Sequence, residues 1–252
     1  MKKILIFLLL LFPFIGYGQS ISNQIFKDHQ VEGSMTIYAY NKQRWLYSDS
    51  LDAIRETLPG ATFNLINSCI ALETGVIRTE NELIKWEGKE SDLKTAYRNA
   101  TNWFYMELAK KIGRKDYLEF LKAFYYGNLN FAERSADFWN TGAFGISPKG
   151  QIEFLKRFSR QQMYLSPRTF RIGNELLNTE KTGDYTFVDQ SSVVKSQGKD
   201  MAWYIGYVYN KTNAYYFATR IKKPTDKKIA DFQKLARKIT LSILKQNKIY
   251  PQ

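Results

Sequence analysis

Strand-like segments lie near both ends of this 252-residue chain, and helix-like segments lie between them. Residues 34–40 alternate in the manner of a half-buried strand, and residues 44–47 can pair with them across a short polar turn. Toward the other end, residues 203–208 and 214–221 flank a polar turn and predict an antiparallel hairpin. The pattern predicts an α+β fold, with a central antiparallel sheet built from the terminal strands and a helical middle region.

The middle of the chain carries helical periodicity. Apolar residues recur at steps of three and four in residues 62–74, 100–112, 116–124 and 148–158. We find no internal repeat and no low-complexity linker that would divide the chain. The strands and helices are therefore expected to form one domain.

The C-terminal segment combines apolar and basic residues. Phe232, Ile239 and Ile243 recur at helical spacing with lysines between them, which predicts an amphipathic helix. Pro224 precedes this segment, as a helix-start signal would. The simpler interpretation is a docked helix with a solvated basic face. The alternative is attraction to an anionic surface, such as lipid headgroups or an acidic polymer.

Charge and rare residue types narrow the chemistry. Lys and Arg number 37 against 24 Asp and Glu, which gives a formal net charge of +13. A net positive charge is compatible with binding to nucleic acid, but the sequence has no basic-aromatic motif of a known nucleic-acid-binding domain. We therefore expect no nucleic-acid partner. Because Cys69 and His29 are the only residues of their kinds, a disulfide scaffold and a zinc site of several Cys and His ligands are excluded. We expect neither a metal nor another cofactor.

The N-terminus has the three regions of a signal peptide. Lys2 and Lys3 are followed by an apolar stretch over residues 4–15 and by the small residues of Gly16-Tyr17-Gly18. A membrane anchor is the alternative, but the apolar run is short against the roughly 20 residues that span a bilayer. We predict a signal peptide over residues 1–18 and an exported domain over residues 19–252. The mature protein would then be periplasmic or secreted.

Seven short motifs follow one another between residues 59 and 219. They are residues 59–75, 84–89, 103–113, 126–128, 138–139 with 146–155, 181–183, and 203–208 with 216–219. Their order and residue types resemble those of the class D β-lactamases, the oxacillinases. The resemblance extends to the wider penicillin-binding, transpeptidase-like superfamily, including the sensor domains of antibiotic-responsive receptors. It implies a serine β-lactamase/transpeptidase-like fold for nearly all of the mature chain.

The resemblance does not extend to the catalytic residues. The family's Ser-Xaa-Xaa-Lys motif places a nucleophile and its base on one face of a helix. Here the Ser position is Ala61 and the Lys position is Asn64. Ala61 has no nucleophilic atom, and the Asn64 amide does not titrate near neutral pH. Thr62 points about 100° away from Ala61 on a helix and is a poor substitute.

The family's second motif, Ser-Xaa-Val, falls on Ala100-Thr101-Asn102. Its Ser is absent, and its apolar Val, which packs over the Lys in the family, is Asn102. We therefore expect Asn64 and Asn102 to face each other as a polar, hydrogen-bonded pair. The degenerate catalytic positions are thus Ala61, Asn64, Ala100 and Asn102.

Other motif residues are candidates for ligand binding. The resemblance assigns Lys181-Thr182-Gly183 to an edge strand beside the pocket, where the family holds a substrate carboxylate. It assigns Trp139 to the cover of the catalytic Lys, and Tyr126 and Asn128 to the floor of the cleft. For Trp139 and Tyr126, packing in the core is the competing interpretation.

Two functions of different classes follow. The first is a catalytically inactive, exported relative of class D β-lactamases that binds a carboxylate-bearing peptidoglycan-like or β-lactam-like ligand, or a protein partner, without acylation. The second is a β-lactam hydrolase or acylated β-lactam sensor of altered mechanism. Loss of a nucleophile or its base costs about 10⁴–10⁶ in rate, which favours the first.

Overall fold

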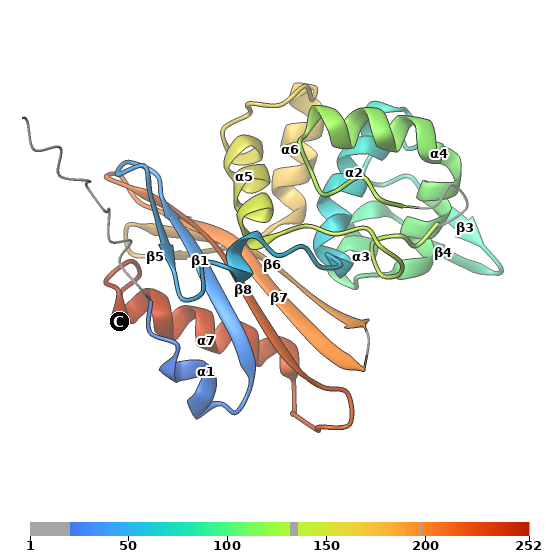
Figure 1. Cartoon of the computed structure of the whole chain (residues 1–252). Coiled ribbons are helices and arrows are strands. Elements are labelled where there is room, and N and C mark those ends of the chain that lie inside the picture. Colours follow the sequence, from blue (N-terminus) through green and yellow to red (C-terminus); the bar gives the residue numbers. More distant parts are fainter. Residues whose placement is uncertain (1–20, 132–135, 197, 252) are drawn as a thin grey trace, which may run out of the picture.

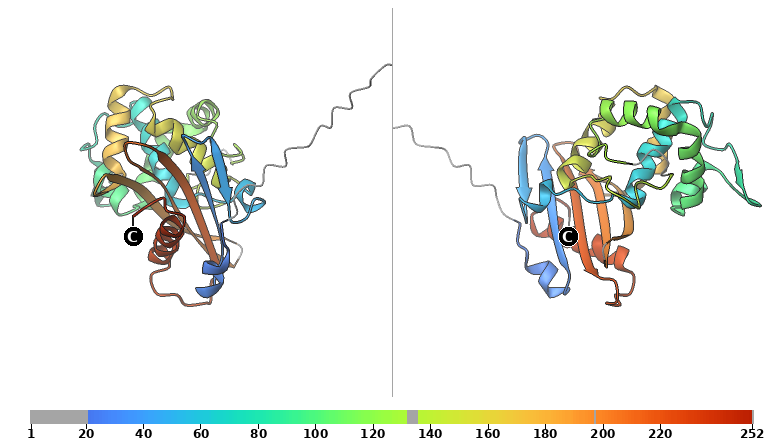
Figure 2. Two further views of the ribbon diagram at one scale, coloured as in Figure 1. Left: turned by 90° about the vertical axis from the view of Figure 1, so that its left-hand side faces the viewer. Right: turned by 45° about the vertical axis from the view of Figure 1, so that its right-hand side comes forward.

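The computed structural model describes residues 21–131, 136–196 and 198–251. A six-stranded sheet in the order β2-β1-β8-β7-β6-β5 forms its centre, and every neighbouring pair in it is antiparallel. A helical region covers one face of the sheet, while α1 (Gln24–Asp28) and α7 (Phe232–Gln246) cover the other (Figures 1 and 2). The predicted α+β architecture, with a central antiparallel sheet and a helical middle region, is confirmed. The predicted signal peptide, residues 1–18, lies outside the described residues.

The terminal strands meet in the sheet as predicted. Strand β1 (Glu32–Ala39) pairs with β2 (Arg44–Tyr47) on one side and with β8 (Ala214–Pro224) on the other. Strand β8 also pairs along its whole length with β7 (Lys199–Tyr209), which is the predicted hairpin. Segments from the two ends of the sequence therefore hold one another in place, and the helical middle is attached to this frame (Figure 1).

Two further strands extend the sheet beyond the predicted ones. Strand β6 (Tyr185–Ser196) pairs with β7 over its full length, and the short β5 (Asn178–Thr182) forms the sheet edge. Strand β5 covers β6 only as far as Asp189, its partner being Asn178. From Gln190 onward, the outer edge of β6 pairs with no strand among the described residues.

The helices of the middle region follow the predicted periodicity with one change. The segment predicted over residues 62–74 is a 3₁₀ turn, η2 (Gly60–Phe63), that leads into the buried helix α2 (Asn64–Glu73). The two helices predicted over residues 100–124 are confirmed: they are the two halves of α4 (Asn102–Ala123), separated by a kink at Gly113, where φ is 78° and ψ is 162°. The remaining elements on this side are η1 (Asp52–Ile54), β3 (Ile84–Trp86), β4 (Lys89–Ser91), α3 (Leu93–Arg98), α5 (Pro148–Ser159) and α6 (Pro167–Leu176).

The C-terminal helix α7 is amphipathic, as predicted. Phe232, Ala236 and Ile239 are buried against the sheet, and Asp231 begins the helix by accepting a hydrogen bond from the Lys234 backbone N–H at 3.0 Å. Pro224 is the last residue of β8 and not a helix-start residue. Among the described helices, none is long and apolar enough to cross a membrane.

Candidate functional site

The nucleophile position of the resemblance lies in η2, where the helical region meets the sheet. Ala61 is half-buried, and its backbone N–H donates a hydrogen bond of 2.7 Å to the Ser192 Oγ on β6. In serine acyl-transfer enzymes the N–H of the nucleophilic residue can serve as one donor of the oxyanion hole. At Ala61 that donor already has a partner within the protein.

Gly60 explains how the two segments come so close. Its φ of 57° lies in the left-handed region, which favours glycine. A Cβ atom at Gly60 would lie 2.2 Å from the Ser192 Oγ and 3.2 Å from the Val194 Cβ. The turn before Ala61 therefore requires glycine for both its backbone conformation and its contact with β6.

The base position is occupied by a neutral amide inside the protein. Asn64 is the first residue of α2 and is 3% exposed. The neighbouring Thr62 is no replacement nucleophile, because it is 1% exposed and its hydroxyl donates to the Pro59 carbonyl at 2.8 Å. The same hydroxyl accepts a hydrogen bond from the Gln151 Nε2 at 2.8 Å.

The second motif, Ala100-Thr101-Asn102, lies at the protein surface. Ala100 is exposed and has a left-handed backbone, with φ of 47°, just before α4 begins at Asn102. The Asn102 Nδ2 donates to the Asp137 Oδ2 at 3.2 Å, and its Oδ1 accepts from the Asn140 Nδ2 at 3.0 Å. The prediction that Asn102 pairs with Asn64 is therefore wrong. Asn102 sits at the exposed start of α4, where the polar groups of residues 137–140 satisfy its amide.

The predicted placement of Lys181-Thr182-Gly183 beside the pocket is also wrong. These exposed residues lie at the turn between β5 and β6, where Lys181 pairs with Thr186 and the Thr182 Oγ1 accepts from the Tyr250 hydroxyl. Ser192, which contacts Ala61, lies six residues further along β6. At about 3.3 Å per residue this separation is about 20 Å. The Lys-Thr-Gly string is on an edge strand, as predicted, but it is not beside the pocket.

The strand segment that does lie beside Ala61 is Gln190-Ser191-Ser192. The Gln190 Oε1 accepts from the Tyr97 hydroxyl at 2.9 Å, and its buried Nε2 has no partner among the described residues. Ser191 points to the opposite face, where its hydroxyl accepts from the Gln233 Nε2 at 2.5 Å. We infer that these three residues occupy the place that the resemblance gives to Lys-Thr-Gly.

Sequence reasoning missed this segment because its letters match no motif. A signal was present, since residues 185–196 are rich in β-branched and aromatic side chains and directly precede the predicted hairpin. Such a strand would have been placed next to β7.

The remaining ligand-binding candidates have structural roles among the described residues. Trp139 is 1% exposed and stacks on Phe63, with ring centroids 5.5 Å apart and an interplanar angle of 18°. Tyr126 is fully buried and donates to the Gln151 Oε1 at 3.1 Å. Asn128 orders a loop, because its Oδ1 accepts from the Gly145 backbone N–H at 3.1 Å. Trp139 and Tyr126 thus follow the core interpretation.

Three buried titratable groups on and around α2 favour their neutral forms. Burial raises the pKa of the Tyr97 and Tyr105 phenols and of the Cys69 thiol above their usual values. None of these groups is therefore an ionised base at neutral pH. Within the described ranges, no three His, Cys, Asp or Glu residues are grouped as a metal site.

Comparisons with known proteins place this arrangement in a class. Residues 27–172 match the family described as the penicillin binding protein transpeptidase domain. The chain is 31% identical to beta-lactamase OXA-48 of Klebsiella pneumoniae over 238 residues, which cover 91% of this chain and 88% of that protein. The chain therefore belongs to the class D β-lactamase family.

Solved structures agree with this assignment. The class D beta-lactamase from Sebaldella termitidis superposes with a TM-score of 0.85 at 32% identity, covering 92% of this chain and 99% of that one. The C-terminal domain of the Bacillus licheniformis BlaR penicillin-receptor superposes with a TM-score of 0.82 at 24% identity, covering 93% and 99% of the two chains. At that identity the likeness to the receptor concerns the fold alone.

Proposed function

We propose that this protein is an exported, non-acylating member of the class D β-lactamase family. It binds a carboxylate-bearing peptidoglycan-like or β-lactam-like ligand, or a protein partner, without forming an ester. The observation that carries the proposal is the pair of Ala61 and Asn64 at the positions of the nucleophile and its base. An acyl-enzyme needs an oxygen or sulfur nucleophile, and Ala61 offers only a methyl group.

The surroundings of Ala61 support the same conclusion. Because Ser192 accepts the Ala61 N–H, a substrate carbonyl would have to displace that hydroxyl to reach the donor. Because the adjacent strand carries Gln190 where the family has a lysine, the cleft also lacks that positive charge. The nucleophile, its base and a free oxyanion donor all serve acylation. Their joint loss therefore supports a site that does not acylate.

Ligand recognition in this cleft would rest on neutral hydrogen-bonding groups. The Gln190 amide keeps an unpaired N–H among the described residues, and β6 keeps an unpaired outer edge beyond Asp189. Backbone groups of such an edge can pair with an extended peptide or with a β-lactam amide. Binding by these groups is reversible, as the proposal requires.

A fluorescent penicillin decides between the proposal and its alternative. Purified protein is incubated with the probe, denatured, and examined by gel fluorescence and intact mass. We expect no covalent adduct and no nitrocefin hydrolysis above the uncatalysed rate. A denaturation-resistant adduct that Thr62→Val abolishes would establish the acylating alternative, and reversible binding of unlabelled penicillin is measured in parallel by calorimetry.

Export is tested separately. The proposal places the mature protein outside the cytoplasm after cleavage near Gly18. Cell fractionation followed by N-terminal sequencing should return a chain that begins at about residue 19. A cytoplasmic protein that still begins at Met1 would remove this part of the proposal and leave the rest intact.

A further inference from the structure

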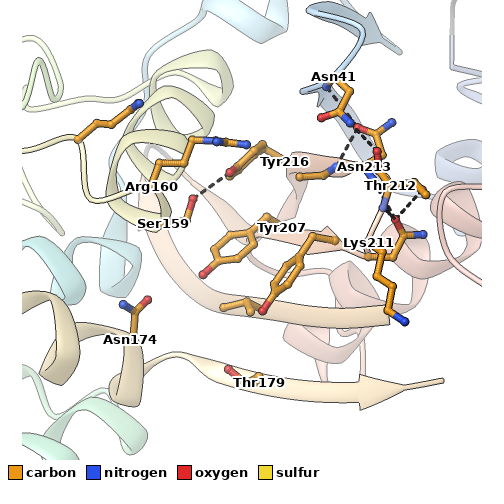
Figure 3. A pocket seen from close by; sticks show the side chains of 15 residues that line it. Asn41, Ser159, Arg160, Asn174, Thr179, Tyr207, Lys211, Thr212, Asn213 and Tyr216 are labelled. Atoms are coloured by element: carbon orange, nitrogen blue, oxygen red, sulfur yellow. Dashed lines mark hydrogen bonds between the residues drawn. The ribbon is translucent and has the colours of Figure 1, made fainter. Parts of the chain in front are cut away.

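We propose that a second site, at the β7–β8 turn end of the sheet, binds an acidic saccharide. A cavity of about 800 Å³ opens there between the C-terminal ends of α5 and α6 and the sheet. Figure 3 shows Arg160, Ser159 and Tyr216 on one side of it and Thr179 and Asn174 across from them. Tyr207 lies between the two groups.

This cavity differs from an ordinary small-molecule pocket in its polarity. Small-molecule sites are lined mostly by apolar groups, with a few polar ones that orient the ligand. Here only Val188 and Ala214 among the fifteen lining residues have apolar aliphatic side chains. Such a lining matches a ligand that carries hydrogen-bonding groups on all sides, as a sugar does.

Several of these polar groups have no side-chain partner among the described residues. They include the Gln162 amide and the hydroxyls of Thr179, Tyr207 and Tyr209. Burial raises the pKa of Tyr207 above its usual value, so its hydroxyl stays protonated and can donate. By contrast, Asn210 is engaged in ordering its own turn, because its Oδ1 accepts from the Thr212 and Asn213 backbone N–H groups at 2.9 Å. The turn is ordered, and the other groups are available to a ligand.

The charge of the lining indicates an anion. Arg160 and Lys211 line the cavity, no carboxylate does, and neither cation forms an ion pair with a described carboxylate. The Arg160 guanidinium lies 3.3 Å from the centroid of the Tyr40 ring. Stacking fixes the plane of the guanidinium and leaves its N–H edge for a carboxylate.

Aromatic rings provide the third feature of the cavity, a surface on which a sugar can stack. Tyr207 and Tyr209 stand 6.2 Å apart with an interplanar angle of 27°, and Tyr209 is 43% exposed. An exposed ring offers an apolar face to the C–H groups of a pyranose, and its hydroxyl offers a hydrogen bond to the edge. Stacked rings, free hydroxyls and two unpaired cations together specify a sugar that bears a carboxylate.

The cavity is separate from the degenerate cleft. On β7, the partner of Ser192 is Trp203, while the cavity is lined by Tyr207 and Tyr209. The nearest lining residue on β6 is Val188, which is two residues from Gln190 and four from Ser192, or about 7 and 13 Å along the strand, and the lining contains none of Ala61, Gln190 and Ser192. The second site therefore does not depend on the proposed function, and either can fail alone.

The test is a titration of ¹⁵N-labelled exported protein with three matched probes. These are methyl β-D-glucuronide, methyl β-D-glucoside and acetate. We expect saturable shifts of the backbone amides of residues 207–214 with the glucuronide, and affinities weaker by about 10-fold or more for the other two, because each lacks one half of the recognition. Adenosine monophosphate is titrated as a competing class of ligand.

Variants locate the binding. Arg160→Ala combined with Lys211→Ala should weaken glucuronide binding by about 10-fold or more, and Tyr209→Ala should also weaken it. The matched control is Arg98→Ala, an exposed arginine on α3 that does not line the cavity, which should leave the affinity unchanged. Thermal unfolding of each variant verifies that the fold is intact.

Three results would overturn the proposal. Equal affinity for acetate and glucuronide would mean a simple anion site, and tighter binding of adenosine monophosphate would mean a nucleotide site. Absence of saturable shifts with the glucuronide at residues 207–214, in protein that is folded, would mean that no saccharide binds there.

Discussion

Two regions that meet at η2 differ in how closely their residues match those of the class D β-lactamase family. On one side of Phe63 lies a cluster of buried aromatic rings, including Tyr126, Phe138 and Trp139, which matches the motif order of the class D family. On the other side lies the η2 turn at Ala61, where we propose that Ala61 and Asn64 replace the family's nucleophile and base. The contrast indicates that packing and catalysis place separate demands on the same turn. A sequence can satisfy the first without the second.

The sharpest test of this contrast is to rebuild the cleft without touching the aromatic cluster. The variant combines Ala61→Ser and Asn64→Lys with Gln190→Lys and Ser192→Gly. If the scaffold is intact, penicillin acylation should rise by about 10⁴-fold or more over the parent protein, measured with the fluorescent probe.

A smaller variant checks the placement of β6. With only the two changes on the helical side, the backbone N–H of residue 61 is still bonded to Ser192, so acylation should be about 10²–10³-fold slower than in the four-residue variant. Equal rates would show that the β6 segment does not belong to the site. Lys181→Ala should change neither rate, since Lys181 lies at the far turn.

The aromatic side should respond through stability. Trp139→Ala removes a buried ring and should lower the free energy of unfolding by about 3–5 kcal/mol, measured by urea denaturation. Tyr164→Ala is the matched control, because Tyr164 is 89% exposed and its loss should cost less than about 0.5 kcal/mol. Similar losses for the two variants would mean that Trp139 is not part of the core.

The loop that leads into the cleft is held by a buried ion pair. The fully buried Arg220 donates to the Asp52 Oδ2 at 3.2 Å and to the Thr57 Oγ1 at 2.6 Å. Burial alone would raise the pKa of Asp52, but the Arg220 guanidinium and the Ser34 hydroxyl outweigh it and lower that pKa below its usual value.

This pair predicts a pH dependence. Because the folded pKa of Asp52 is lowered, its stabilisation is present above the unfolded pKa of about 3.9 and is lost as the pH falls through the folded value. Asp52→Asn should lower the free energy of unfolding by about 2–3 kcal/mol at pH 7. It should also reduce the loss of stability that the parent protein shows as the pH falls into the acid range. If the variant loses as much stability at acid pH as the parent protein does, Asp52 is not the group responsible for that loss.

The smallest expected effect concerns the contact between the turn and the strand. Gly60→Ala should destabilise the protein by about 1–3 kcal/mol, because it combines a left-handed backbone with a clash against Ser192. Adding Ser192→Gly should relieve the clash with Ser192 and recover part of the loss in a double-mutant cycle. Strictly additive losses would show that the two residues do not touch.

Much of the frame could be predicted from local patterns. The alternation in residues 34–40 and the paired runs of residues 203–221 correspond to β1, β7 and β8. Periodicity located α2, α4, α5 and α7 to within a few residues. These predictions succeed because the burial of one face imposes a period on each element.

The cleft could be predicted only in part. The identities of Ala61 and Asn64 were readable, but the partner strand was assigned to Lys181-Thr182-Gly183 on the basis of three matching letters. The Asn102 side chain was also expected inside the cleft, and it pairs outside with Asp137 and Asn140. Both errors concern contacts between side chains of different segments. The hydrophobic periodicity of one segment does not show which residues of another segment it contacts.

What the sequence determined by itself is the terminal strands, the main helices α2, α4, α5 and α7, and the absence of a hydroxyl and an amine at residues 61 and 64. Periodicity and side-chain chemistry are local, so one chain suffices to read them. What only the tertiary structure decided is that Ser192 closes onto Ala61 and that Lys181 stands about 20 Å away along β6. Strand register sets both distances, and register arises from the packing of the whole sheet.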